Sequence, residues 1–142
     1  MKLSILLKDL YETRFSMRLL IDTHLLLWAA NDTLPKKAVP YFSNNNNELF
    51  FSSASIWEIV IKRGLNRPNF EINPNDLYCG LVNNGYNELT VTSHHTLLVA
   101  HLPPFHKDPF DRILVAQAMA EGLTLLSSDE SLSQYSPVIY FN

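Results

Sequence analysis

Short apolar segments alternate with segments of helical period along this chain of 142 residues, and this alternation constrains the fold more than any other feature. The pattern is typical of an α/β fold in which helices cover a parallel sheet. We therefore predict one α/β domain, with a five-stranded parallel sheet flanked by helices. The expected strands are residues 18–21, 48–52, 88–92, 123–127 and 137–141.

The segments between these strands have the period or the capping residues of helices. The best-defined helix has Asp108 as its cap, Pro109 in its first turn and Gly122 at its end. Pro40 strains the helix expected at residues 35–43, because proline has no backbone N–H to donate. That helix covers residues 108–122, and the other helices are expected at residues 24–31, 54–65, about 75–84 and 94–102.

The composition is that of a globular protein with a low net charge. The formal net charge of −3 argues against binding nucleic acid by bulk electrostatics alone, but a metal-dependent nuclease remains open. The single cysteine, Cys79, excludes an intramolecular disulfide and a cysteine-ligated zinc site, and we expect it to be a small core residue. No apolar stretch reaches membrane-spanning length and no export signal is visible, so we expect a cytoplasmic protein without membrane attachment.

Four acidic residues lie at the ends of apolar segments or inside them, where core packing does not require a charge. They are Asp22, Glu58, Asp111 and Asp129. Carboxylates are seldom fully buried unless they are paired or bind a metal. Parallel α/β sheets bind ligands beyond the carboxyl ends of their strands, and Asp22 and Asp129 both follow such ends. The spacing therefore predicts a site that concentrates negative charge to hold hard divalent cations.

Each of these carboxylates also has a structural alternative. Asp22 and Asp129 could each cap the helix that follows. Glu58 could form an ion pair with Lys62, four residues later on the same helix. We favour a site role for Glu58, because Lys62 can reach solvent while Glu58 lies among apolar residues on a helix that we expect to be largely buried.

Two aspartates, Asp108 and Asp111, are candidates for the third acidic residue of the predicted site. Asp108 and Asp111 stand as N-cap and third residue of one helix, so a capping role accounts for either. Asp111 is in phase with Leu114 on the side that faces the sheet, which favours Asp111 as the site residue and leaves Asp108 as the cap. Asp108 remains a possible metal ligand, and it could also pair with Arg112.

The remaining polar residues carry weaker signals. Arg112 and Ser127 are candidates for substrate contact, Arg112 through a phosphate and Ser127 by orienting a carboxylate or a water molecule. Basic residues at 62–67 are further candidates for phosphate contact. The histidines do not form a catalytic set; His24 and His106 could fall near the cleft, but no pattern assigns them a role.

The acids and the strings around them resemble the PIN-domain nucleases, and specifically the VapC-type toxins of bacterial toxin–antitoxin pairs. The matching strings are LLIDTHLLLW, SSASIWEIVIKRG, HKDPFDRILVAQAMAEGLTLLSSD and PVIYF, within residues 17–142. The resemblance implies a PIN-like fold over residues 17–142, with residues 1–16 as an N-terminal extension. The second aspartate of DPFDR departs from the commoner pattern. The residues implied to be catalytic and to bind metal are Asp22, Glu58, Asp111 and Asp129.

The resemblance further implies Mg²⁺, for which Mn²⁺ can substitute, RNA as substrate, a cognate antitoxin as partner, and a homodimer. The chemistry agrees, because phosphodiester hydrolysis by metal-activated water needs only divalent ions held by carboxylates. Two other classes stay open: a non-catalytic PIN-like module that binds metal or protein, and a phosphatase-like α/β domain. The sequence after strand one, Asp22-Thr23-His24, lacks the second nearby aspartate of such phosphatases.

Overall fold

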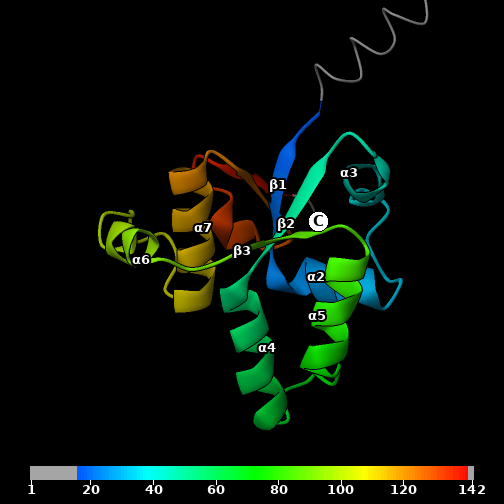
Figure 1. Ribbon diagram of the computed structural model, residues 1–142. Helices are drawn as coiled ribbons and strands as arrows, with labels where there is room; N and C mark the ends of the chain where they lie inside the picture. The colour runs from blue at the N-terminus through cyan, green and yellow to red at the C-terminus, as the bar shows by residue number, and fades with distance from the viewer. Residues whose placement is uncertain (1–15, 141–142) are drawn as a thin grey trace, which may run out of the picture.

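The computed structural model describes residues 16–140, and one sheet of five parallel strands forms their centre (Figure 1). The strands are β1 (Arg18–Ile21), β2 (Glu48–Ser52), β3 (Asn87–Leu89), β4 (Thr124–Ser127) and β5 (Val138–Tyr140). Their order is β3-β2-β1-β4-β5, and every neighbouring pair is parallel. The predicted fold class is confirmed. The expected N-terminal extension, residues 1–16, falls almost wholly outside the described residues.

Helices connect the strands and cover both faces of the sheet (Figure 1). They are α2 (Thr23–Ala30), α3 (Val39–Ser43), α4 (Ser53–Gly64), α5 (Pro74–Asn83), α6 (Ser93–Val99), α7 (Pro109–Glu121) and the 3-10 helix η1 (Glu130–Leu132). The predicted boundaries of α7 are confirmed: Asp108 caps it, and Gly122 ends it in the left-handed conformation with φ of 65°.

Two elements differ from their predicted ranges. Helix α3 begins at Val39 instead of residue 35, which places Pro40 in the first turn, where a missing N–H costs nothing. Strand β3 covers residues 87–89 instead of 88–92, because Thr92 is already the N-cap of α6 and its side chain accepts from the backbone N–H of His95. At β3, a local capping requirement overrides the pattern of apolar residues.

Alternate residues of the central strand pack into two hydrophobic cores, one on each face of the sheet. Leu19 and Ile21 belong to the core shared with α2, α4 and α5. Leu20 belongs to the core shared with α7. All three side chains are fully buried, as expected when helices cover both faces of a parallel sheet. The carboxyl ends of all five strands consequently share one edge, which is the edge at which Asp22 and Asp129 were expected to meet.

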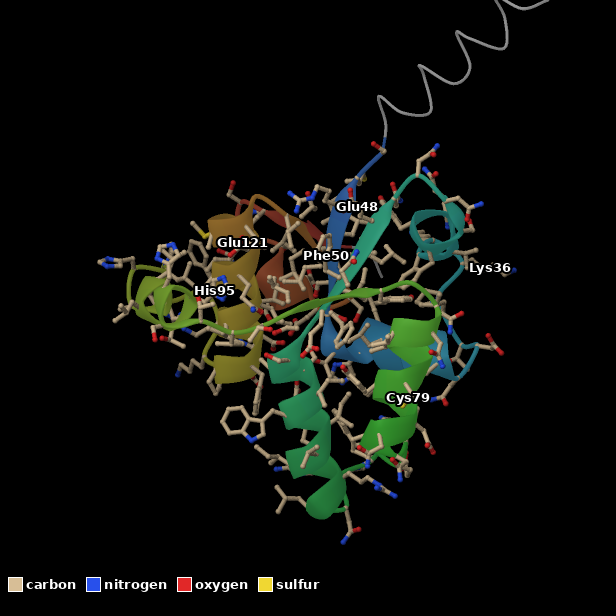
Figure 2. All side chains as sticks on the ribbon, viewed as in Figure 1. Lys36, Glu48, Phe50, Cys79, His95 and Glu121 are labelled. Atoms are coloured by element: carbon tan, nitrogen blue, oxygen red, sulfur yellow. The ribbon has the colours of Figure 1, made fainter. Side chains whose placement is uncertain are left out.

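Two predictions about burial are wrong. Helix α4 was expected to be largely buried, but 61% of Trp57 and 49% of Val60 are exposed, since the core requires only one face of the helix. Cys79 was expected in the core, yet it is exposed on α5, where Leu77 and Leu81 provide the buried face (Figure 2). Within residues 16–140, no helix is long and apolar enough to cross a bilayer.

Candidate functional site

Asp22 follows the last residue of β1 and is only 4% exposed. One carboxylate oxygen, Oδ1, accepts from the backbone N–H of Leu25 at 2.9 Å, so Asp22 does cap α2. The other oxygen, Oδ2, accepts from the hydroxyl of Ser127 at 2.7 Å and from the N–H of Ser128 at 3.1 Å. Burial raises the pKa of Asp22 above its usual 3.8, although these three hydrogen bonds oppose the change. Asp22 therefore caps α2 with one oxygen and is hydrogen-bonded to the end of β4 through the other.

Ser127 connects the carboxyl ends of the adjacent strands β1 and β4. Its hydroxyl donates to Asp22, and the same oxygen accepts from the backbone N–H of Asp129 at 3.0 Å. Because Ser127 is fully buried with its hydroxyl engaged in both directions, it orients carboxylates and does not face a substrate. Of the two roles considered for Ser127, the structure supports the orientation of a carboxylate.

Glu58 lies on the buried face of α4, 2% exposed, and both of its oxygens have partners. Thr23 donates its hydroxyl to Oε1 at 2.6 Å, and the ammonium of Lys62 donates to Oε2. The i,i+4 ion pair that the sequence analysis placed second is thus formed, with the Lys62 side chain 25% exposed. The Ser55 hydroxyl lies 3.0 Å from the oxygen of the same Thr23 hydroxyl, which ties α2 to α4 beside the carboxylate.

Asp108 and Asp111 occupy the start of α7 as predicted. Asp108 Oδ1 accepts from the backbone N–H groups of Phe110 at 2.8 Å and Asp111 at 3.2 Å, so Asp108 is the N-cap. The Asp111 side chain is 21% exposed, and Leu114 one turn later is buried against the sheet. Arg112 does not pair with Asp108; its guanidinium donates to the carbonyl oxygens of Val99 and His106 at 3.0 and 3.1 Å.

This placement of Arg112 disagrees with the predicted substrate contact. The guanidinium ties the loop before α7 to the end of α6, and its NH1 group also lies 3.5 Å from the hydroxyl of Tyr135. An arginine whose fork already donates to backbone carbonyl groups holds the loop in place and offers little to a phosphate. The residue was predicted from its charge alone, and its partners come from segments that the sequence does not reveal as neighbours.

Asp129 follows β4 and lies close to a histidine. Its Oδ1 accepts from the backbone N–H of Ser131 at 3.0 Å and from the Ser131 hydroxyl at 2.6 Å, so Asp129 caps η1. Its Oδ2 is 3.0 Å from Nε2 of His106, which also lies 3.3 Å from Oδ2 of Asp111. Burial raises the pKa of Asp129, but the hydrogen bonds from Ser131 and His106 outweigh it and hold the pKa below 3.8.

The electrostatics of Asp111 show that the acids of the site act on one another. Burial, followed by the negative charges of neighbouring carboxylates, raises the pKa of Asp111 from 3.8 to about 8. The carboxylates responsible are Asp108, Glu58, Asp22 and Asp129. The four elements that carry the predicted quartet therefore converge at the carboxyl edge of the sheet, in a region that disfavours one more negative charge.

Among residues 16–140, one group of three potential ligands has an atom from each within 4.8 Å of the others: His106, Asp111 and Asp129. Asp22 and Glu58 lie behind it, each held by hydroxyl, N–H or ammonium donors. The oxygen-rich donor set and the raised pKa of Asp111 fit a divalent cation, because such an ion would offset the repulsion among the carboxylates. Of the four predicted ligands, Asp111 and Asp129 belong to this group and could hold the ion, whereas Asp22 and Glu58 lie outside it with both carboxylate oxygens hydrogen-bonded.

Sequence reasoning missed Thr23 and Ser55, and it placed His106 near the cleft without assigning it a role. Thr23 and Ser55 are small polar residues at 2% and 1% exposure that connect α2, α4 and Glu58. Each stands within the first turns of a helix that follows a strand, which is the signal that would have found them. His106 lies two residues before the cap Asp108, and only the fold brings it to Asp129.

Comparison with known proteins agrees with this geometry. A family model described as PIN domain matches residues 19–136. Solved structures with the same fold include VapBC2 from Rickettsia felis bound to a DNA fragment from its promoter, at 15% identity and a TM-score of 0.64. That match covers 89% of this chain and 98% of the other. DNA-bound VapBC from Salmonella typhimurium matches at 11% identity and a TM-score of 0.63, covering 88% and 97%.

A toxin–antitoxin complex from Klebsiella pneumoniae matches at 15% identity and a TM-score of 0.61, covering 84% of this chain and 94% of the other. No curated protein sequence matches this one. At these low identities, the matches to solved structures establish a shared fold and no more. The family model covers most of the domain, including all four acids of the predicted quartet. On that match, this chain belongs to the PIN-domain family.

Proposed function

We propose that this protein is a metal-dependent endoribonuclease that serves as the toxin of a toxin–antitoxin pair. The observation that carries the proposal is the convergence of Asp22, Glu58, Asp111 and Asp129 from four elements at one edge of the sheet, where burial and the charges of the neighbouring carboxylates raise the pKa of Asp111. Membership of the PIN-domain family and the shared fold with toxin–antitoxin complexes support it.

The residues divide the work of the proposed reaction between them. Asp111 and Asp129 are the more exposed carboxylates, at 21% and 42% for their side chains, and they face the incoming phosphodiester. Asp22 and Glu58 are held behind them by Ser127 and Thr23, so the negative charge of the site stays fixed in place. Mg²⁺ or Mn²⁺, when bound, would supply charge neutralisation and water activation for phosphodiester hydrolysis.

The two alternative classes are less well supported by the geometry. A phosphatase-like enzyme would need Asp22 as a free nucleophile, but both of its oxygens accept hydrogen bonds and the residue is 4% exposed. A module that binds only protein would not need four acids that destabilise one another, and RNA cleavage distinguishes a nuclease from a module that binds metal without turnover. The accumulated repulsion at Asp111 is a cost that metal-dependent chemistry explains and simple packing does not.

An exposed apolar surface beside the acids is the candidate docking site for the antitoxin. Trp57 on α4 meets Phe110 on α7 edge to face at 5.3 Å, and both line a cavity of about 590 Å³. Val99 of α6 and Ile113 of α7 extend the apolar lining. Such a surface is typical of an interface with another protein. A second copy of this chain, as expected for a homodimer, is the other occupant to be tested.

The proposed activity is tested by incubating the purified protein with RNA in Mg²⁺ or Mn²⁺, with and without EDTA. We expect cleavage that stops in EDTA and leaves 5′-phosphate and 3′-hydroxyl ends. Asp22→Asn and Asp111→Asn should abolish it, and Asp76→Asn should not, because Asp76 is an exposed acid at the matching position of α5. Undiminished cleavage in EDTA would contradict the proposed metal dependence.

The toxin role is tested in cells. Expression of the chain alone should arrest growth, and Asp22→Asn should relieve the arrest. Co-expression with the small protein encoded by the neighbouring gene should neutralise the wild type. Trp57→Glu should escape this neutralisation while still cleaving RNA, because the Trp57 side chain packs on Phe110 and is 61% exposed. If Trp57→Glu instead loses self-association and is still neutralised, the apolar surface is the homodimer interface.

A further inference from the structure

His106 is the histidine nearest to the acids, and both of its ring nitrogens are engaged. It lies in the loop before α7 with a side chain that is 15% exposed. Nε2 lies 3.0 Å from Oδ2 of Asp129 and 3.3 Å from Oδ2 of Asp111. Nδ1 accepts from the backbone N–H of Asp108 at 3.0 Å. The ring is therefore a link between the cap of α7 and two acids of the quartet.

The hydrogen bond at Nδ1 decides which nitrogen carries the proton. A backbone N–H can only donate, so Nδ1 must present a lone pair to Asp108. In the neutral ring the proton then resides on Nε2, and Nε2–H donates toward the oxygens of Asp129 and Asp111. A nitrogen that carries a proton cannot bind a metal ion. His106, although it lies within 4.8 Å of the two carboxylates, is consequently a donor to ligands and not a ligand itself.

The loop holds this ring in a fixed place. The backbone N–H of His106 donates to the hydroxyl of Tyr135 at 3.2 Å, and its carbonyl oxygen accepts from Arg112 at 3.1 Å. Tyr135 is buried and donates its own hydroxyl to Pro103 at 2.7 Å. These hydrogen bonds fix the position of the His106 ring. Its Nε2 faces one carboxylate oxygen of Asp129, which follows β4, and one of Asp111, which lies on α7.

We propose that His106 is a positioning residue, whose Nε2–H holds the carboxylates of Asp111 and Asp129 together so that they bind a divalent metal as a prepared pair. The inference rests on the proposed metal-dependent function. Partners that orient metal ligands are worth about 10–100-fold in metal affinity.

The first test measures metal affinity directly, by electron paramagnetic resonance of free Mn²⁺ titrated into the full chain. His106→Ala should weaken Mn²⁺ binding by about 10-fold or more. His106→Gln should recover most of that loss, because its amide N–H can donate to both carboxylates. His101→Ala, an exposed histidine in the segment after α6, is the matched control and should bind Mn²⁺ like the wild type. An unchanged affinity in a folded His106→Ala protein would overturn the inference.

The second test separates positioning from direct ligation by comparing Co²⁺ with Mg²⁺. Imidazole nitrogen favours Co²⁺ over Mg²⁺, so loss of a histidine ligand would weaken Co²⁺ binding far more than Mg²⁺ binding. We expect His106→Ala to weaken both by the same factor. A selective loss of Co²⁺ affinity would show that Nε2 is a ligand and would overturn the inference.

The third test needs no variant, so it holds even if a substitution prevents folding. Nitrogen-15 NMR of the wild-type histidines should show the Nε2–H form of His106, both without metal and with saturating Mg²⁺. A proton on Nδ1 in the metal-loaded protein would overturn the inference. Wild-type protein that binds Mn²⁺ but leaves RNA intact would contradict the proposed function, while the three tests of His106 would still be decided by metal binding.

Discussion

Replacing Asp111 with asparagine should stabilise the metal-free protein while removing its activity. Asparagine has the shape of a protonated aspartic acid and carries no charge. In the folded protein the pKa of Asp111 is about 8, against 3.8 for an aspartate in solvent. Between these values the folded chain holds a proton that the unfolded chain has lost. The free energy of unfolding therefore falls as pH rises from about 4 to about 8.

The size of the effect follows from the same pKa difference. Each pH unit within that window costs up to about 1.4 kcal/mol, so the penalty at pH 7 reaches roughly 4 kcal/mol. Because 21% of the Asp111 side chain is exposed, solvent screens part of this, and we expect about 2–4 kcal/mol. For a domain of this size, that raises the melting temperature of Asp111→Asn by about 6 °C or more at pH 7.

The assay is urea unfolding of wild type and Asp111→Asn at pH values from 4 to 8.5, in EDTA. The difference in the free energy of unfolding should be close to zero at pH 4 and should grow up to pH 8. Asp76→Asn is the control, because Asp76 also stands third in a helix that begins with proline, under an asparagine cap, but on an exposed surface. Its effect on stability should stay small at every pH.

Added metal should narrow the difference in stability between the wild type and Asp111→Asn. Mg²⁺ stabilises the folded state of whichever protein binds it. The wild type should gain stability in Mg²⁺ while Asp111→Asn gains little, so the gap between them closes. A variant that is less stable than wild type at pH 7 in EDTA, or a difference that does not change with pH, would refute the account of Asp111 as an acid destabilised by its neighbours.

Three further predictions concern other parts of the chain. Asp108→Ala should lower the free energy of unfolding by about 0.5–2 kcal/mol, and Asp108→Ser should restore it in urea unfolding, because serine can also cap α7. Ser127→Ala should reduce RNA cleavage by a larger fraction than it reduces the free energy of unfolding, measured in parallel. The reason is that the buried Asp22 carboxylate loses one of its hydrogen-bond donors. Deletion of residues 1–16 should leave the circular dichroism spectrum and RNA cleavage nearly unchanged, because the contacts of Met17 with Asn47 remain; insoluble protein would contradict it.

The features that the sequence predicts well are those that depend on neighbouring residues. The cap, proline and glycine of α7 fix both ends of that helix within its own sequence, and its structure agrees at Asp108 and Gly122. Asp22 and Asp129 were placed correctly because all carboxyl ends of a parallel sheet share one edge. In each case the physical cause is local, or it follows from the topology alone.

The features that the sequence could not give depend on contacts between distant segments. Trp57 is apolar and lies in phase with buried residues, yet it is 61% exposed, because its contact with Phe110 of α7 covers only part of the ring. Arg112 has the charge of a phosphate contact, but the carbonyl groups of Val99 and His106 take its donors. The same loop brings His106 to Asp129, 23 residues away. Residue type and spacing contain no information about such partners.

The hydrogen bond between Ser127 and Asp22 joins positions 105 residues apart in the chain. Asp129 lies two residues after Ser127, so the acidic site combines early and late parts of the sequence. During synthesis, a ribosome that has released only the first strands and helices presents a partial chain without β4 and without Asp129. Contacts between residues this far apart in the sequence form late in folding, because closing the loop between them costs conformational entropy. The acidic site is therefore incomplete until translation of this chain is almost finished.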